Sequence, residues 1–394
     1  MRDTVGSGAY RERPRNRGGS GTNRRGARAS GRHDRGRRRM GSPAVRRAPG
    51  AVFMSTKQAR AERLRGWVSR FAGQPVAVLG DLVADEFVFG DISRVSREAP
   101  VLILDEIRRV LVPGGAGNSV ANLQALGARP IPVGVIGHDE AGRGVLECLR
   151  DQGVRTTQLV RDKAYATPTK SRILAGGIHT RRQQIVRIDR GRPRGNLGPT
   201  LRRRILTNLS RALDGSRGLL IADYGYGAAA PSSRLLATIH KLATAGTPVT
   251  IDSRARVTEY RGMTVCSPNQ EELESALGGA LITDRALPTA GKELLRRTGN
   301  RAVLVTRGAK GMTLFERRMK PTMIPAYGSE EVADVTGAGD TVIATLTLAL
   351  IAGANLIDAA ILANYAAGIV VQKMGTATVS PGELLAAIET DPAG

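Results

Sequence analysis

The chain has 394 residues, of which 41% are hydrophobic, so it can bury the core of one large domain or two ordinary ones. Its two cysteines, Cys148 and Cys266, are too few for a disulfide framework or a cysteine metal site, and they suit a reducing cytoplasm. The formal net charge of +24 is typical of nucleic-acid-binding proteins, but it is spread unevenly along the chain.

Residues 1–50 carry half of this excess charge. They hold 15 arginines, no lysine and three acidic residues, a net charge of +12, with almost no large apolar side chains. Such a segment cannot bury enough surface to offset the entropy of ordering, so we expect a disordered leader over 1–54 and a folded domain over 55–394. The leader could bind nucleic acid or membrane lipids, although it lacks interleaved aromatic residues on which bases stack. We favour the alternative that it lies upstream of the true translation start, at Met40 or Met54.

Short apolar runs alternate with longer helical patterns from residue 75 onward. The runs predict strands at 75–81, 131–137, 218–225, 248–254 and 302–308, and the helical patterns lie at 117–128, 142–153, 232–246 and 270–279. Strands that alternate with helices form a mostly parallel sheet through right-handed crossovers, with helices on both faces. The predicted fold class is therefore α/β, with three α/β/α layers.

Two segments, residues 85–113 and 167–190, break this alternation. Polar and apolar residues alternate in them without a helical face, as in exposed antiparallel strands. They leave from points near strand ends, where open α/β sheets bind ligands, so they are predicted to form a small lid over that site. The alternative is a hairpin insertion without a role in binding.

The longest apolar segment begins at Val342. Asn355 and Asp358 interrupt it, so it falls short of the roughly 20 apolar residues that a membrane span needs. We predict a buried core helix and a cytoplasmic protein.

The stretch DVTGAGDT, residues 334–341, places two glycines and two carboxylates immediately before this helix. It lacks the lysine of a Walker A loop and the third glycine of a dinucleotide fingerprint. If Gly337, Ala338 and Gly339 form the turn into a helix, their amides and the helix dipole can hold an anion such as a transferring phosphoryl group. Asp340 could then accept the proton of an attacking hydroxyl. Taken alone, an acidic helix cap after a tight turn explains the stretch equally well.

Two signatures in this chain resemble those of the ribokinase-like (PfkB) carbohydrate kinases. The DVTGAGDT stretch resembles their C-terminal signature, and GGAGNSVANLQALGA, residues 114–128, resembles their N-terminal one. SPNQEE at 267–272 is similar to their N-x-x-E motif, and VTRGAKG at 305–311 to their nucleotide-side turn. The match covers about residues 75–390 and implies an ATP- and Mg²⁺-dependent sugar kinase with a ribokinase-like fold.

Within that family, the segments at 80–101, 169–189, 222–227 and 365–381 look closest to the heptose-7-phosphate kinase domain of bifunctional ADP-heptose synthases. The resemblance implies phosphorylation of the anomeric hydroxyl of D-glycero-D-manno-heptose 7-phosphate. It also implies a separate nucleotidyltransferase for the next step, since no such domain follows the kinase half, and a possible homodimer through the lid. The alternatives are another sugar or nucleoside kinase of this family, or a nucleic-acid-binding protein that acts through the leader.

The resemblance also assigns residues to the phosphoryl-transfer chemistry. Asp340 would be the general base, with Gly337, Ala338 and Gly339 as the anion site. Asn269 and Glu272 would lie near Mg²⁺, Glu272 through water, although an Asn cap with a capping-box Glu explains their spacing equally well. Three further residues would lie along the nucleotide, or would form a plain strand and turn: Thr306, Gly308 and Gly311.

The sugar site is expected at the first strand end and on the lid. Polar or glycine positions that suit the sugar hydroxyls are Asp81, Asp85, Gly114, Gly115 and Asn118, although Asp81 could instead cap the following turn. Basic lid residues that suit a phosphate already on the sugar are Lys170, Arg172 and Arg187, with solvated surface charges as the alternative. Tyr226 and Arg254 depart from the heptose kinase pattern, which has lysine at both positions, so the exact substrate stays open.

Overall fold

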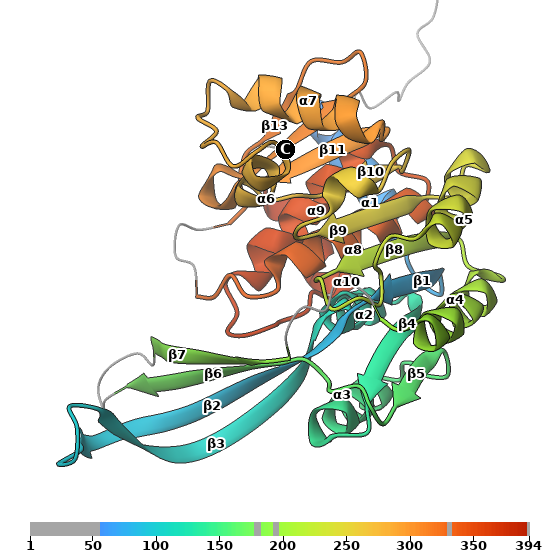
Figure 1. The fold of residues 1–394 in the computed structure, drawn as a ribbon. Helices are drawn as coiled ribbons and strands as arrows, with labels where there is room; N and C mark the ends of the chain where they lie inside the picture. Colours follow the sequence, from blue (N-terminus) through green and yellow to red (C-terminus); the bar gives the residue numbers. More distant parts are fainter. Residues whose placement is uncertain (1–55, 177–182, 192–196, 329–332, 392–394) are drawn as a thin grey trace, which may run out of the picture. The chain divides into compact units, whose positions relative to one another are not determined.

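The computed structural model describes residues 56–176, 183–191, 197–328 and 333–391 (Figure 1). The predicted disordered leader lies outside the described residues. Within the described part of the chain, nine strands form a central sheet in the order β13-β12-β11-β10-β9-β8-β1-β4-β5. These strands are β1 (Pro75–Gly80), β4 (Arg129–Gly137), β5 (Leu159–Asp162), β8 (Gly218–Asp223), β9 (Val249–Ser253), β10 (Val265–Cys266), β11 (Ala302–Thr306), β12 (Met312–Glu316) and β13 (Thr322–Ile324).

Seven neighbouring strands of this sheet, from β11 to β5, run parallel to one another. β12 and β13 at one edge are antiparallel. The mostly parallel sheet predicted from the sequence is confirmed. Because the carboxyl ends of parallel strands share one edge of a sheet, residues that follow β1, β8, β9 and β10 come close together although they lie far apart in sequence.

Side chains of β1 alternate between two hydrophobic cores. Val76 and Val78 belong to one core, while Ala77 and Leu79 belong to the other. The first core contains α1 (Thr56–Val68), α2 (Ala116–Ala125), α3 (Glu140–Asp151), α8 (Ala338–Ile351), α9 (Leu356–Val370) and α10 (Pro381–Thr390). The second contains α4 (Pro199–Leu213), α5 (Ser233–Thr244), α6 (Gln270–Ala276) and α7 (Leu287–Thr298). Helices therefore cover both faces, and the predicted three-layer architecture is confirmed.

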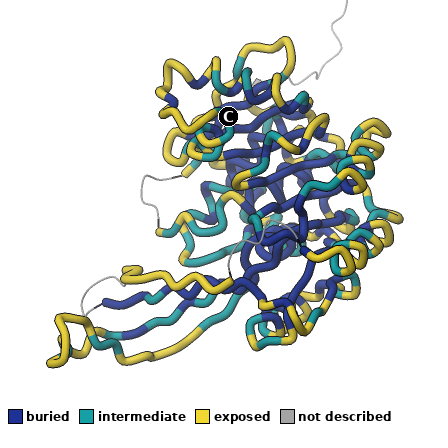
Figure 2. Tube along the Cα trace, in the orientation of Figure 1, coloured by how far each residue is buried: buried dark blue, intermediate teal, exposed yellow. Residues whose placement is uncertain are grey.

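The apolar segment that begins at Val342 forms most of α8 and, after a turn, α9. Most residues of both helices are buried, as the dark central part of Figure 2 shows. Each helix contacts the other or the sheet all round, so the segment forms core helices as predicted. Among the described helices, none combines the length and the apolarity that a bilayer crossing requires.

A second sheet, called the lid sheet here, has the strand order β3-β2-β6-β7. Its strands are β2 (Leu82–Val95), β3 (Leu102–Gly115), β6 (Thr169–Gly176) and β7 (Gln183–Arg190). The pairs β2/β3 and β6/β7 are antiparallel as predicted, but β2 and β6 pair in parallel. The reason is that β2 continues directly from β1 and β6 enters from β5, so both leave the same edge of the main sheet. Burial decreases along β2 from its start to its end (Figure 2).

Hydrogen bonds to one buried carboxylate hold helix α1 against the rest of the domain. Asp358, in the first turn of α9, accepts two hydrogen bonds from the Arg63 guanidinium (2.8 and 3.0 Å) and one from the Trp67 indole (3.1 Å). The Asp358 side chain is fully buried, whereas that of Arg63 is half exposed. Burial alone would raise the pKa of Asp358, but these donors outweigh it and lower the pKa.

We expect Arg63→Met to lower the free energy of unfolding by roughly 1–2 kcal/mol, since Asp358 would stay buried without its charged partner while Trp67 still donates to it. Arg65→Met is the matched control, because Arg65 pairs with Glu389 on the exposed side of the same helix and should contribute under about 0.5 kcal/mol. Urea denaturation followed by circular dichroism and by the single tryptophan, Trp67, measures both. Equal losses in the two variants would contradict this role of Asp358.

Candidate active site

The glycine loop forms the start of α8. Gly337 adopts the left-handed backbone conformation (φ 81°), and a Cβ there would lie 2.4 Å from Nδ2 of Asn118, so the position requires glycine on both counts. The amides of Gly339 and Asp340 lie in the first helical turn, where no carbonyl of the helix can accept from them. The amide of Ala338, predicted as a third donor, instead donates to a carbonyl of the preceding turn (3.3 Å). The start of α8 still offers amides and the positive end of a helix dipole to an anion.

Asp340 is buried and hydrogen-bonded by three side chains. Its Oδ1 accepts from the Tyr224 hydroxyl (2.6 Å) and from the Ser119 hydroxyl (3.3 Å), and its Oδ2 accepts from Nδ2 of Asn118 (3.0 Å). Burial raises the pKa of Asp340 to about 6, against the opposing effect of the hydrogen bonds from Tyr224 and Asn118. An acid with this pKa is ionised at neutral pH and basic enough to take a proton.

A cavity of about 300 Å³ opens beside Asp340, between the carboxyl edge of the main sheet and the base of the lid sheet. Many of the residues predicted from the sequence line it: Asp85, Gly115, Lys170, Arg172, Arg187, Asn269, Glu272, Thr306, Gly337, Gly339 and Asp340. The other predicted residues are not part of its wall: Asp81, Gly114, Asn118, Gly308, Gly311 and Ala338. The fold thus gathers predicted residues from seven elements into one polar cavity.

Asp85 on β2 forms a buried ion pair with Arg172 on β6 (2.6 Å). Gly114 on β3 makes room for it, because a Cβ at Gly114 would lie 2.3 Å from Oδ2 of Asp85. The predicted glycine therefore acts by shape and not by contact with the cavity. Arg172, predicted to bind a phosphate, is already neutralised by Asp85.

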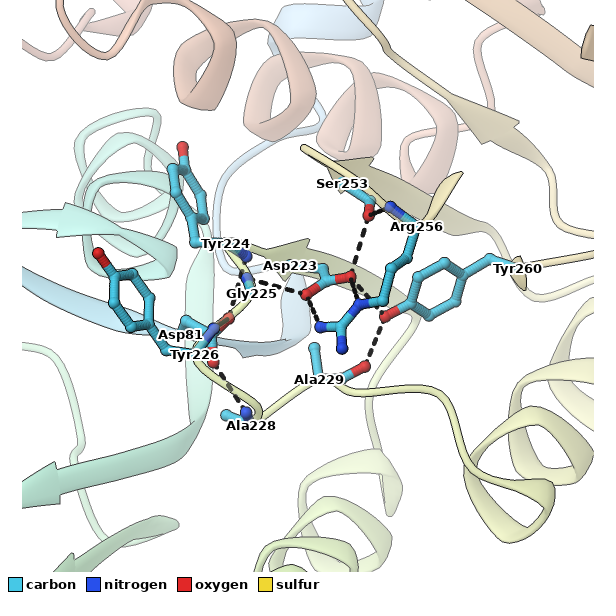
Figure 3. Close-up of polar contacts among 10 residues, drawn as sticks. All are labelled: Asp81, Asp223, Tyr224, Gly225, Tyr226, Ala228, Ala229, Ser253, Arg256 and Tyr260. Atoms are coloured by element: carbon cyan, nitrogen blue, oxygen red, sulfur yellow. Dashed lines mark hydrogen bonds and ion pairs between the residues drawn. The ribbon is translucent and has the colours of Figure 1, made fainter. Parts of the chain in front are cut away.

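Asp81 is hydrogen-bonded to a loop (Figure 3), and it is not among the residues that line the cavity. This loop, residues 224–232, connects β8 to α5 and is called the β8–α5 loop here. The Asp81 carboxylate accepts from the backbone amides of Tyr224 (3.0 Å), Tyr226 (3.0 Å) and Ala228 (2.8 Å). Burial raises the pKa of Asp81 to about 6, while these amides lower it. These contacts differ from the alternative prediction that Asp81 caps the turn following it, since the turn that it caps begins 143 residues later.

The basic residues at the lid base differ in their partners. Arg187 forms an exposed ion pair with Asp189 on its own strand (2.8 Å). Lys170 and Arg254 form no ion pair within the described residues, and they lie against the Tyr224 ring at 5.8 and 4.5 Å from its centroid. Burial lowers the pKa of Lys170, and nearby Arg254 adds to this effect. These two cations are the ones left to meet an anionic ligand.

Asn269 and Glu272 fit both readings of their spacing. They form a complete capping box at the start of α6, and both also line the cavity. Asp252, at the end of β9, lies on the same wall, and its side chain forms no hydrogen bond or ion pair with a described residue. Burial raises the pKa of Asp252, as does the charge of Glu272, and burial also raises the pKa of Glu272. A buried, unpaired carboxylate beside a second one is the donor set that a divalent cation prefers.

Thr306 ends β11 and bridges to Asn269, which places it on the cavity wall. Gly308 and Gly311 form the turn between β11 and β12, and both have positive φ (55° and 75°). A Cβ at Gly311 would lie 2.1 Å from the backbone oxygen of Ile324, so this glycine is required by the turn itself. Their predicted role along a nucleotide remains a prediction.

Comparison with protein families decides the identity of the fold. The model of the pfkB family carbohydrate kinases matches residues 77–189 and 234–382, which include both signatures and the whole cavity wall except the β8–α5 loop. The chain belongs to the pfkB family of carbohydrate kinases. It is thus a phosphotransferase of the sugar kinase class, as the sequence predicts.

Curated relatives of this pfkB kinase are bifunctional proteins. It is 42% identical to the bifunctional protein HldE of Geobacter sulfurreducens over 313 residues, 79% of this chain and 62% of that protein. It is 39% identical to the HldE of Paramagnetospirillum magneticum over 325 residues, 82% of this chain and 65% of that protein. The chain therefore spans less than two thirds of the length of these relatives.

Solved structures confirm the ribokinase-like fold. Arabidopsis thaliana ribokinase complexed with ribose and ATP superposes with a TM-score of 0.62 at 20% identity, over 81% of this chain and all of that one. Escherichia coli phosphofructokinase-2 in complex with substrates and products gives a TM-score of 0.62 at 16% identity, over 80% of this chain and 98% of that one. At these identities the likeness concerns the fold alone.

Three residues of this pfkB kinase's cavity were missed or misread in the sequence. Asp252 follows an apolar strand, so a search for carboxylates at strand ends would have found it. Arg254 was noted only as a departure from lysine, yet it lines the cavity. Tyr224 belongs to the DYGYG stretch, in which only Tyr226 stands out from the sequence pattern, and its contact with Asp340 joins residues 116 positions apart.

Proposed function

We propose that this chain transfers the γ-phosphoryl group of ATP to the anomeric hydroxyl of D-glycero-D-manno-heptose 7-phosphate. The observation that carries the proposal is the position of Asp340, a buried carboxylate on the cavity wall next to the amides of Gly339 and of Asp340 itself. A base and an anion site in one helical turn are the two protein parts that phosphoryl transfer requires.

Asp340 acts as the general base in this proposal. The acceptor hydroxyl gives its proton to the carboxylate as its oxygen forms a bond to the γ-phosphorus, and the bond from that phosphorus to the bridging oxygen of ADP breaks. Charge spreads over the equatorial oxygens of the moving group, and the first-turn amides of α8 donate to them. Each such donor stabilises the transition state by a few kcal/mol, since it is fixed before the reaction begins.

Asp252 and Glu272 would hold the Mg²⁺ that accompanies ATP, directly or through water. Both carboxylates lie on the same cavity wall, and the Asp252 side chain has no hydrogen-bond or ion-pair partner among the described residues. These two features fit a Mg²⁺ site. When bound, the ion supplies positive charge that neutralises phosphate oxygens. Mg²⁺ usually retains several waters, so two carboxylates are enough to hold it beside the phosphates of ATP.

A phosphorylated acceptor is favoured by the charge of the cavity. Lys170 and Arg254 line it without carboxylate partners, and both point at the same aromatic ring. An unphosphorylated sugar would leave Lys170 and Arg254 without an ion pair to the acceptor, although the charges of Asp252 and Asp340 already stabilise Arg254. The HldE relatives support a heptose as the sugar, since the sequence itself resembles the heptose kinase half of such proteins.

The test is a panel of acceptors with coupled detection of ADP. It contains heptose 7-phosphate, the unphosphorylated heptose, fructose, ribose and a nucleoside. We expect the highest kcat/KM for heptose 7-phosphate, with NMR of the product locating the new phosphate on the anomeric carbon. A higher value for another acceptor would favour a different ribokinase-like kinase. Turnover of none, by the full chain or by a form that begins at Met54, would reject the kinase proposal and favour nucleic-acid binding by the leader.

The partners belong to the same proposal. The product of the proposed reaction is a heptose 1,7-bisphosphate, and a separate nucleotidyltransferase would act later on the 1-phosphate that this reaction adds. The two free thiols suit the cytoplasm. We also propose a homodimer through the lid sheet, because several large apolar side chains on it are exposed: Ile92, Val95, Leu102, Ile107, Ile185, Val186 and Ile188. Light scattering should give twice the chain mass for the wild type and the monomer mass for Ile107→Glu. A monomeric wild type would refute the dimer.

A further inference from the structure

We propose that Tyr224 is a positioning residue for this reaction, whose hydroxyl holds the Asp340 carboxylate so that Oδ2 keeps a lone pair for the acceptor hydroxyl. The inference rests on the proposed role of Asp340 as the base. Tyr224 belongs to neither signature of the family, and it lies in a stretch that the family model leaves unmatched.

The hydrogen bonds around Asp340 leave one position open. An ionised carboxylate has about four acceptor positions, two on each oxygen. Tyr224 and Ser119 take both positions on Oδ1, and Asn118 takes one on Oδ2. Asn122 donates to the Asn118 side-chain oxygen (3.2 Å), which fixes the Asn118 amide with its NH₂ toward Asp340. The remaining lone pair, on Oδ2, is therefore the one that the geometry assigns to the acceptor hydroxyl.

Tyr224 makes the shortest of these contacts. At 2.6 Å it has the length of a charge-assisted hydrogen bond between a hydroxyl and a carboxylate, whereas the Ser119 contact is 3.3 Å long. The order of the distances makes Tyr224 the principal donor to Oδ1. Ser119 makes the longer hydrogen bond to the same oxygen, so a variant without its hydroxyl is a reference for a weaker effect.

The backbone that carries Tyr224 is held by two buried carboxylates (Figure 3). Asp81 accepts from three amides of the β8–α5 loop, beginning with that of Tyr224 (3.0 Å). Asp223, at the end of β8, accepts from the next amide, Gly225 (3.2 Å), and is itself bonded by Arg256 Nε (3.0 Å) and three hydroxyl or guanidinium groups around it. A loop fixed at this many points can place a hydroxyl reproducibly.

The Tyr224 ring is also fixed from its sides. The Arg254 guanidinium lies 4.5 Å from the ring centroid and the Lys170 ammonium 5.8 Å from it. Burial raises the pKa of Tyr224 well above its ordinary value, with the charge of Asp340 adding to the effect, so the hydroxyl keeps its proton and remains a donor at every physiological pH.

Asp340 has charged and polar neighbours from every element around it. They are Asn118 and Ser119 on α2, Tyr224 after β8, Asp252 and Arg254 at the end of β9, Asp85 on β2, Lys170 on β6 and Glu272 on α6. Burial raises the pKa of Asp340 and the Tyr224 hydroxyl is the first group that opposes it. Removing that hydroxyl should therefore raise the pKa of Asp340 and leave the other neighbours in place.

The experiment compares Tyr224→Phe with Tyr226→Phe. Tyr226 lies in the same loop and is buried, whereas Tyr224 is partly buried, and no hydrogen bond joins the Tyr226 hydroxyl to Asp340. The protein is labelled with ¹³C at the aspartate carboxyl carbons, and Asp340→Asn identifies the Asp340 resonance. The wild-type carboxyl should titrate near pH 6 and that of Tyr224→Phe near pH 7 or above, since a hydrogen bond to a charged group corresponds to about one pH unit or more. Tyr226→Phe should match the wild type.

The pH dependence of the kinetics should show the same differences between the variants. The wild-type kcat/KM should fall tenfold per pH unit below about pH 6, because a protonated Asp340 cannot accept the hydroxyl proton. In Tyr224→Phe this limb should move to higher pH, which lowers kcat/KM at pH 7 about twofold for a pKa of 7 and about tenfold for a pKa of 8. Ser119→Ala should shift this limb less. If Tyr224→Phe folds poorly, Ser119→Ala is a second variant in which the loss of a hydrogen bond to Asp340 can be measured.

A Tyr224→Phe protein whose Asp340 titrates at the wild-type pH would overturn the inference. So would a pH profile that the substitution leaves in place while kcat falls, since that would indicate a structural role alone. The NMR titration needs no substrate. Absence of turnover with every sugar would therefore refute the proposed function, while the titration would still decide whether Tyr224 controls Asp340.

Discussion

Asp340→Asn should lower kcat by roughly 10²- to 10⁴-fold, the contribution of a positioned general base. The substitution keeps the volume of the side chain and can keep the hydrogen bond from Tyr224, but the amide nitrogen that replaces Oδ2 would face the Asn118 donor and offer no lone pair to an acceptor hydroxyl. Affinity for ATP should change little, because the first-turn amides of α8 remain. Steady-state kinetics with coupled ADP detection, and calorimetric titration with ATP, measure the two effects separately.

Asp358→Asn is the matched control. Asp358 is also a buried aspartate in the first turn of a helix, yet it serves Arg63 and Trp67 and not the cavity. We expect it to lower the free energy of unfolding while kcat stays within a few-fold of the wild type. Near-normal turnover by Asp340→Asn would remove Asp340 from the chemistry, and equal losses in the two variants would show that helix disruption accounts for both.

The fold could be predicted because its signal is local and repeated. Each buried strand is a run of apolar residues about five to seven long, and each helix carries its own cap or periodicity, so the alternation survives without any tertiary information. The lid strands were found in the same way. Their parallel pairing, β2 with β6, depends on where each strand leaves the main sheet, and an alternating pattern contains no information about that.

The site was predictable where a backbone turn needs particular residues. Gly337 must be glycine for its φ and its contact with Asn118, and this requirement is what makes the loop visible in the sequence. Asp81 was placed at the correct strand end, but the direction of its carboxylate is set by the path of the β8–α5 loop some 140 residues later. The contact of Tyr224 with Asp340 could not be predicted for the same reason, since it too depends on the path of the β8–α5 loop.

The partners of the basic residues decide which of them can recognise a phosphate. Sequence reasoning treated Lys170, Arg172 and Arg187 as equals. In the folded chain Asp85 holds Arg172 and Asp189 holds Arg187, whereas Lys170 lines the cavity without an ion pair and Arg254 joins it there. The arginine that replaces the expected lysine keeps the positive charge, so the departure at Arg254 alters the geometry of the charge and not its sign.

Lys170→Met should therefore lower kcat/KM for a phosphorylated sugar by roughly 10- to 100-fold and leave that for its unphosphorylated form almost unchanged, since it removes one charged hydrogen bond to the existing phosphate. Arg187→Met is the control, because Arg187 is half exposed and paired, and it should cost under about fivefold. Arg254→Met is less clean, as Arg254 also lowers the pKa of Asp340 and would shift the pH profile. Side-by-side kinetics with the two sugars separate the cases. An equal loss with both sugars would assign Lys170 to the transferring phosphoryl group. No loss with either sugar would show that the positive charge of Lys170 plays no part in substrate choice.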